Sequence, residues 1–203
     1  MVDRQARDSS ISDSDLMALT AAGDRRAIEQ LMYRHAPAVL RLARAVTGDA
    51  AAAEDTLQQT FLAVYQHASA FRGDSSARAW MLTIARNTAY RMRAKARRQS
   101  VAEEPWIQLG VEAGWGSEDP EALAMAAERR DTLHSAMSTL SAQDLEVLLL
   151  RDIEGLAGSE AAALMGIGER ALKSRLHRAR LRLAAALRRA AQTSATLEQG
   201  ELP

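Results

Sequence analysis

Apolar residues recur along this chain with the three- and four-residue spacing of amphipathic helices, and no alternating run of the strand type occurs in it. In the first half, a short helix is expected to begin after Ser12 or Ser14. Longer helices are expected at about 25–46, 50–68 and 77–98. The loop FRGDSS at 71–76 precedes the last of them, with Asp74 or Ser75 as its cap. The first half is therefore predicted to be helical.

A stretch without helical periodicity divides the chain. From Gln99 to Glu121 inclusive there are six acidic residues, three glycines and two prolines but no basic residue, a composition typical of a linker. Helical spacing returns beyond it. Helices are expected at about 120–138, 141–153, 159–165 and from 169 onward, with a glycine turn at 166–168.

These elements predict an all-α fold of two small helical domains joined by a flexible acidic linker. The length of 203 residues and the 47% of apolar residues are enough for a core in each domain. The expected boundaries are 1–98 for the first domain, 99–119 for the linker, 120–190 for the second domain and 191–203 for a C-terminal tail.

Charge is segregated along the chain, although the formal net charge is zero. Basic residues outnumber acidic ones by 8 to 1 in residues 71–100 and again by 8 to 1 in residues 161–190, whereas residues 101–160 carry 3 basic and 13 acidic groups. A solvated helix surface mixes its charges more finely, so the pattern favours two contacts with a polyanion, joined by an acidic connector. Ordinary charged helix surfaces are the alternative.

The second basic block has the pattern of a helix-turn-helix. A short helix, the turn GIG and a basic second helix are typical of proteins whose second helix enters the DNA major groove. At about 100° per residue, one side of this second helix is apolar, with Leu172, Leu176, Ala179, Leu183 and Leu187. The opposite side carries the candidate DNA-binding residues Arg170, Lys173, Ser174, His177 and Arg178. A helical hairpin with a solvated basic face would produce the same pattern.

The first basic block follows a helix face of unusual composition. Trp80, Thr83, Asn87, Tyr90 and Arg91 share one side of the helix expected from Ala77 and are predicted to point outward. Such a face suits unpaired bases, because aromatic rings stack on bases, an amide reads a base edge and arginine binds the backbone. In the alternative, Trp80 belongs to the core and the arginines are solvated.

A third face lies on the helix expected at 50–68. Its apolar side carries Leu57, Phe61, Val64 and Tyr65, which are predicted to be buried. The opposite side carries Asp55, Gln58, Gln59 and Leu62. This mixture suits a specific contact with another protein, and it is equally compatible with a plain solvated surface.

Other kinds of chemistry have little support in the sequence. There is no cysteine, and the four histidines lack the spacing of metal ligands. Paired carboxylates and phosphate-binding loops are not found either, so no catalytic residue, metal or cofactor is predicted. The N-terminus lacks an apolar signal core, and no stretch approaches the roughly 20 apolar residues that span a bilayer. A cytoplasmic protein without membrane insertion is expected.

Taken in order, these segments resemble the extracytoplasmic-function (ECF) sigma factors, the smallest class of the sigma-70 family. The segment AAAEDTLQQTFLAVY is similar to the family block A-x-D-x-x-Q-x-x-F, and FRGDSSARAWMLTIARN is similar to F-R-G followed by W-L-x-x-I-A-x-N. In the second domain, a Glu-x-Ala helix is followed by KSRLHRAR, similar to K-S-R-L-x-R-A-R. The resemblance covers about residues 12–98, as region 2, and 120–190, as region 4.

The resemblance implies a factor that binds RNA polymerase core, recognises the promoter −10 and −35 elements and helps to open the duplex. The polar face from Asp55 to Leu62 would contact core, with Phe61 buried behind it. Lys173, Ser174, His177 and Arg178 match the positions that read the −35 element. The −10 element would be bound by Phe71, Arg72, Trp80, Thr83, Asn87, Tyr90 and Arg91, of which Phe71 belongs to the loop that captures a flipped base.

Two positions depart from the family pattern. Tyr90 occupies a place where the family often has an acidic residue, and Ala171 replaces the usual threonine ahead of the recognition lysine. These two departures affect which promoter sequence the resemblance implies, and they do not change the implied role of the protein.

The resemblance also implies an anti-sigma partner that occludes the same surfaces. The acidic linker is expected either to associate with the basic faces, which would discourage DNA binding by the free chain, or to follow the RNA path of the polymerase. A stand-alone helix-turn-helix regulator, which would bind duplex DNA without polymerase, is the alternative function, and a nucleic-acid enzyme is a more remote one.

Overall fold

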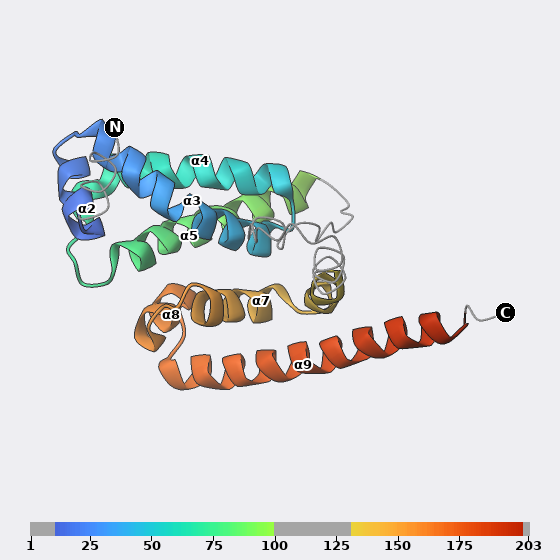
Figure 1. Cartoon of the computed structure of the whole chain (residues 1–203). Coiled ribbons are helices and arrows are strands. Elements are labelled where there is room, and N and C mark those ends of the chain that lie inside the picture. Colours follow the sequence, from blue (N-terminus) through green and yellow to red (C-terminus); the bar gives the residue numbers. More distant parts are fainter. Residues whose placement is uncertain (1–10, 100–130, 201–203) are drawn as a thin grey trace, which may run out of the picture.

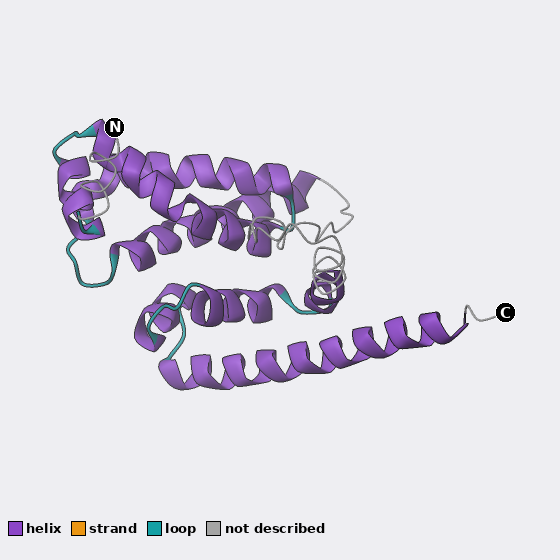
Figure 2. Ribbon diagram, in the orientation of Figure 1, coloured by secondary structure: helices purple, strands orange, loops and turns teal. Residues whose placement is uncertain are grey.

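The computed structural model describes residues 11–99 and 131–200, and in these ranges the regular structure is helical, with no strand (Figure 2). The all-α prediction is confirmed. Most of the predicted linker at 99–119, and the predicted helix start at Pro120, lie outside the described residues.

The N-terminal domain is a bundle of helices that packs its apolar stripes inward. Its elements are α2 (Asp13–Ala21), α3 (Arg25–Thr47), α4 (Ala50–His67), the short 3₁₀ turn η1 (Ala68–Ala70) and α5 (Ala77–Gln99). Leu31, Leu42, Val64 and Met81 are completely or almost completely buried between them. These residues come from three different helices, so the core fixes the faces that α4 and α5 present to solvent.

Local capping explains where these helices begin and end. The Ser12 side chain accepts from the N–H of Asp15 and begins α2, and Asp24 begins α3 in the same way. At the end of α3, Gly48 adopts a left-handed conformation with φ of 71°. The cap of α5 was expected at Asp74 or Ser75, but the Ser76 hydroxyl accepts from the N–H of Ala79 at 3.2 Å instead.

The C-terminal domain begins, within the described residues, with a helical segment at 131–138. It continues with α7 (Ala142–Leu148), η2 (Leu149–Ile153), α8 (Gly158–Met165) and α9 (Glu169–Gly200). Gly166 ends α8 with φ of 67°, as the predicted glycine turn requires. Helix α9 continues to Gly200 and so includes most of the segment predicted as a tail at 191–203.

The segment η2 is a π-helical turn that continues α7. The N–H of Glu154 donates to the carbonyl of Leu149 at 2.8 Å, an i to i−5 bond, where an α-helix would use the i−4 carbonyl. Periodicity correctly predicted helix from Ser141 to about Ile153, but it did not distinguish the wider turn. Glu154 therefore occupies a different angular position than an α-helix would give it.

The two domains pack against each other. In Figure 1, α7 and α8 lie between α5 and α9, and contacts join α3 with α7 and α5 with α8. The first half of the helix-turn-helix therefore faces the N-terminal domain, while α9 lies on the far side of α7 and α8. Within the described ranges, no helix combines the length and the apolar character needed to cross a bilayer.

Candidate functional site

The candidate DNA-binding residues of α9 share an exposed face. Leu172, Leu176 and Ala179 are buried, as predicted, and attach α9 to α7 and α8. The five candidates on the opposite side are all exposed: Arg170, Lys173, Ser174, His177 and Arg178. Arg178 is held along the helix, because its Nε donates to the Ser174 carbonyl at 3.3 Å. The face therefore offers guanidinium, ammonium, hydroxyl and imidazole groups to a base edge or a phosphate.

The polar face of α4 is also open to solvent. All four candidates for a protein contact are exposed: Asp55, Gln58, Gln59 and Leu62. Phe61 is 3% exposed, which confirms its expected burial behind this face. Tyr65 was expected in the buried stripe, but it is 40% exposed. Since Val64 fills the core position beside it, Tyr65 lies at the edge of the stripe and adds apolar surface next to the polar residues.

The candidate face of α5 is more enclosed. Asn87 and Arg91 are exposed, as is Arg72 in the preceding loop, whereas Thr83 and Tyr90 are partly buried. Trp80 also differs from its expected outward position, because it packs against Phe71.

Trp80 is partly buried and packs on the core cluster with Phe71. Their rings meet edge to face, with centroids 5.8 Å apart and an interplanar angle of 64°. The outward position predicted for Trp80 is therefore only half correct. The loop from Phe71 folds back over the start of α5, a long-range arrangement that the phase of one helix does not contain.

Comparison with known proteins assigns both halves of the chain. Residues 31–99 match sigma-70 region 2, and residues 130–183 match sigma-70 region 4. The chain is 31% identical over 181 residues to the RNA polymerase sigma factor CnrH of Cupriavidus metallidurans, covering 87% of this chain and 94% of CnrH. It is also 31% identical over 175 residues to the ECF RNA polymerase sigma factor SigM of Mycobacterium tuberculosis, covering 85% of this chain and 83% of SigM.

Solved structures agree with this assignment. CnrH in complex with the cytosolic domain of CnrY is similar with a TM-score of 0.58 and 31% identity, covering 86% of this chain and 96% of CnrH. The sigma factor RpoE of Bartonella quintana, in complex with the anti-sigma factor NepR, has a TM-score of 0.62 and 28% identity, over 79% of this chain and 96% of RpoE.

The chain is an ECF sigma factor of the sigma-70 family. It directs RNA polymerase core to specific promoters for the initiation of transcription. The match of both halves favours this function over a stand-alone helix-turn-helix regulator, which would need no region 2. From here, region 2 denotes the described residues 11–99 and region 4 the described residues 131–200.

In this sigma factor a buried carboxylate of region 4 binds the predicted −10 helix of region 2. Glu146 of α7 is 0% exposed. Its Oε1 accepts from Nε of Arg86, and its Oε2 accepts from the Tyr90 hydroxyl at 2.9 Å. The Arg86 guanidinium also lies 4.6 Å from the centre of the Tyr90 ring. Burial, followed by the nearby charge of Glu146, raises the pKa of Tyr90, so its hydroxyl remains a donor.

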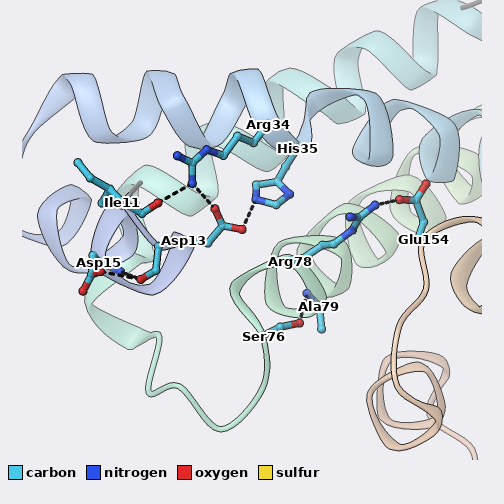
Figure 3. A network of polar contacts seen from close by, with 10 residues as sticks. Ile11, Asp13, Asp15, Arg34, His35, Ser76, Arg78, Ala79 and Glu154 are labelled. Atoms are coloured by element: carbon cyan, nitrogen blue, oxygen red, sulfur yellow. Dashed lines mark hydrogen bonds and ion pairs between the residues drawn. The ribbon is translucent and has the colours of Figure 1, made fainter. Parts of the chain in front are cut away.

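A second carboxylate of region 4 holds two arginines of region 2. Glu154, which follows η2, has a completely buried side chain. Its Oε1 accepts from Nε of Arg41 on α3 at 2.7 Å. Its Oε2 accepts from Nη2 of Arg78 on α5, as Figure 3 shows. Burial, followed by the charge of Arg41, lowers the pKa of Arg78. Two guanidinium groups of region 2 thus share one carboxylate of region 4.

A third carboxylate reaches the loop before α5. Glu160 of α8 accepts from the backbone N–H of Ser76 at 2.9 Å and from that of Ala157 at 3.1 Å. Burial alone would raise the pKa of Glu160, but the hydrogen bonds from Ser76 and Ala157 together lower it. Glu160 is therefore held as a carboxylate between the two regions.

These contacts between the regions were not predicted from the sequence. The segment LEVLLLRDIEGL did contain a signal, since Glu146 interrupts the apolar run 145–150, whereas Glu154 follows Arg151 and Asp152 and is less conspicuous. Acidic residues are rarely buried without a partner, so carboxylates in such a run indicate a cation on another element. The sequence does not say which cation. No role was predicted from the sequence for the three arginines that provide it, Arg41, Arg78 and Arg86.

Proposed function

We propose that the three faces of this sigma factor divide promoter recognition between them, and that α9 reads the −35 element. The observation that carries this proposal is the position of Arg170, Lys173, Ser174, His177 and Arg178 on one exposed face of the second helix of a helix-turn-helix. Leu172 and Leu176 bury the opposite side, so the face is rigidly presented. Arg178 suits a guanine edge, and Ser174 suits either a base or a phosphate.

Region 2 binds the −10 element through α5 and the loop before it. Asn87 offers an amide to a base edge, while Arg72 and Arg91 offer charge to the strand backbone. The Phe71 and Trp80 rings, which pack edge to face, offer an extruded base an aromatic partner. Stacking of this kind helps to offset the few kcal/mol that unstacking a base typically costs. Thr83 and Tyr90 complete the same face.

RNA polymerase core binds the exposed face of α4. Asp55 provides a charge, Gln58 and Gln59 provide amides, and Leu62, which is 56% exposed, provides an apolar contact. Interfaces commonly combine an apolar centre with a polar rim. Once core holds both regions along a promoter, two individually weak DNA contacts act together through effective concentration.

An anti-sigma factor is the proposed regulator. Both solved relatives are complexes, of CnrH with the cytosolic domain of CnrY and of RpoE with the anti-sigma factor NepR. We place this sigma factor in the cytoplasm, where core polymerase and promoter DNA are available to it.

Run-off transcription with purified core polymerase and a library of genomic promoter fragments tests the assignment. Arg178→Ala is expected to retain core binding and to lose dependence on the −35 element, whereas Arg188→Ala, an exposed arginine of the same helix outside the reading face, behaves as wild type. Asp55→Arg is expected to abolish core binding, with Glu54→Arg as its neighbouring exposed control. Transcription by Asp55→Arg at the wild-type level would refute the assignment of α4.

A further inference from the structure

We propose that the packed arrangement of the two regions is an autoinhibited form, in which carboxylates of region 4 occupy donors of region 2 that otherwise bind the −10 strand. The proposal rests on the −10 function proposed above for α5. It concerns the free chain, before polymerase or an anti-sigma factor has bound. We call this arrangement the closed form.

The contacts between the regions join carboxylates on one side to donors on the other, three of which are arginines. Region 4 contributes carboxylates, from Glu146, Glu154 and Glu160. Region 2 contributes donors, from Arg41, Ser76, Arg78, Arg86 and Tyr90. The acidic and basic blocks that the sequence separates are therefore brought together in space. The carboxylates come from α7, η2 and α8, which lie outside the −35 reading face.

The closed form occupies part of the proposed −10 face itself. Tyr90 belongs to that face, and Arg86 lies beside Asn87 on the same helix. Thr83, Asn87 and Tyr90 are spaced by four and three residues and therefore share a side of α5. Since Glu146 binds Arg86 and Tyr90, region 4 lies against one end of this side. A DNA strand that follows the face from Asn87 toward Tyr90 meets α7.

A phosphate can replace the carboxylate that binds Arg86. Guanidinium groups bind carboxylates and phosphates with the same donor geometry. Opening would release Arg86 and Tyr90 from Glu146, on the side of α5 that carries the −10 face. DNA and region 4 thus compete for these two donors.

The closed form can open reversibly. Glu146 and Glu154 lose their hydration in the closed form, and they recover it when the regions separate. A buried ion pair often gains little over its solvated parts, because desolvation offsets much of the Coulomb attraction. The closed form is therefore specific in geometry without being strongly favoured, and binding to polymerase can open it.

The experiment compares the separation of the regions with single-strand binding in the full chain. Because the natural sequence contains no cysteine, single cysteines at Glu29 in α3 and Ala163 in α8, both exposed, accept a donor and an acceptor dye cleanly. The variant is Glu146→Gln with Glu154→Gln, which keeps side-chain size and removes both charges. The control is Asp152→Asn, which breaks an ion pair with Arg180 inside region 4.

In the wild type, energy transfer is expected to be high, and a fluorescein-labelled single-stranded DNA of mixed sequence is expected to bind weakly. In the double variant, transfer falls and the affinity for this DNA rises about tenfold, within the range of allosteric coupling. Asp152→Asn resembles the wild type in both measurements. Unchanged transfer in the double variant, or reduced transfer without a gain in DNA affinity, overturns the proposal.

A second variant keeps the test decisive if the double variant does not fold. Arg41→Glu places a carboxylate beside Glu154 from the region 2 side, and Arg41 lies outside the proposed DNA and polymerase faces. Energy transfer is expected to fall, whereas Arg26→Glu, at an exposed position of the same helix, leaves it unchanged. Equal transfer in the two variants contradicts the closed form.

The proposed −10 function is judged separately, by run-off transcription with core. If transcription requires Asn87 and Arg91 but the double variant gains no affinity for single-stranded DNA, only the autoinhibition is wrong. If transcription is insensitive to Asn87→Ala and Arg91→Ala, the −10 assignment itself fails, whatever the dyes report.

Discussion

The Tyr90 hydroxyl donates a hydrogen bond of 2.9 Å to Oε2 of Glu146, across the boundary between region 2 and region 4. Position 90 is one of the two at which this sequence departs from the family pattern, where an acidic residue is common. A carboxylate there would face the carboxylate of Glu146 and repel it. The departure therefore has a structural consequence in this chain, since it permits the closed contact.

Tyr90→Phe is expected to open the closed form, because a buried carboxylate loses one of its two donors. A hydrogen bond to a charged group typically contributes about 1.5–3 kcal/mol. Energy transfer between the dyes at positions 29 and 163 measures the change. Tyr33→Phe is the control, since Tyr33 is 88% exposed on α3. A Tyr90→Phe protein as closed as the Tyr33→Phe protein would show that the hydrogen bond does not hold the regions together.

The stability of region 2 is expected to fall as the pH drops below 6.5, because of His35. Its Nε2 donates to Oδ2 of Asp13 at 2.7 Å, and its buried Nδ1 has no hydrogen-bond partner among the described residues (Figure 3). Burial lowers the pKa of His35 from 6.5, although Asp13 opposes the shift. The unfolded chain therefore takes up this proton first, and stability is lost as the pH falls from 6.5 through the folded pKa.

Thermal unfolding at pH values above and below 6.5 measures this effect. His35→Gln keeps a donor near Asp13 and removes the titration, so its midpoint should change less across this window. His67→Gln, at an exposed position, should retain the wild-type dependence. The carboxyl of Asp13 does not confuse the result, because its pKa is lowered from 3.8 and its own contribution is lost only at more acid pH. Identical pH curves for the two variants would exclude His35 as the source.

Gly166→Ala is expected to destabilise the helix-turn-helix. Gly166 has φ of 67°, and an alanine in this left-handed conformation costs roughly 1–2 kcal/mol. Gly168→Ala is the matched control, because Gly168 has no positive φ and nothing lies within 4 Å of an added Cβ. Thermal unfolding should separate the two variants, with Gly168→Ala within about 0.5 kcal/mol of wild type. Similar losses in both would mean that the left-handed conformation of Gly166 does not explain the loss of stability.

The neighbours Phe61 and Leu62 are expected to separate stability from polymerase binding. Phe61 is 3% exposed, and Phe61→Ala should reduce the free energy of unfolding by about 3–5 kcal/mol. Leu62 is 56% exposed, so Leu62→Ala should change stability by less than about 0.5 kcal/mol while weakening core binding. Denaturant unfolding and co-elution with core measure the two effects. Full core binding by Leu62→Ala would remove this residue from the proposed interface.

The features that sequence predicted well are determined locally. Caps and glycine turns fix helix ends through residues only a few positions apart, and α3 accordingly runs from Arg25 to Thr47, against an expected end at about Val46. Helical phase also placed Leu172 inside and Lys173 outside. Each of these depends on the geometry of a single helix, so one sequence is enough to predict it.

The features that sequence did not predict depend on contacts between elements far apart in the chain. Glu146 and Arg86 are separated by 60 residues and belong to different regions. The periodicity of the sequence indicates that Glu146 interrupts an apolar run. It does not indicate which cation neutralises the Glu146 carboxylate. The position of Trp80 differs from its prediction for the same reason, since Phe71 contacts it from a loop that folds back over α5.

The π-helical turn of η2 keeps two carboxylates in register although the segment carries one residue more than a regular helix would need. In an α-helix, the eight positions from Glu146 to Glu154 would rotate through about 800°, about 80° beyond two full turns. The wider turn rotates each residue by a smaller angle, and both carboxylates indeed face region 2. A homologue one residue shorter, with regular α-helix here, would keep both carboxylates on this side, because seven positions rotate through about 700°. A homologue of the same length without the wider turn would direct one of them away, so self-restraint could be lost in a lineage without altering a residue that touches promoter or polymerase.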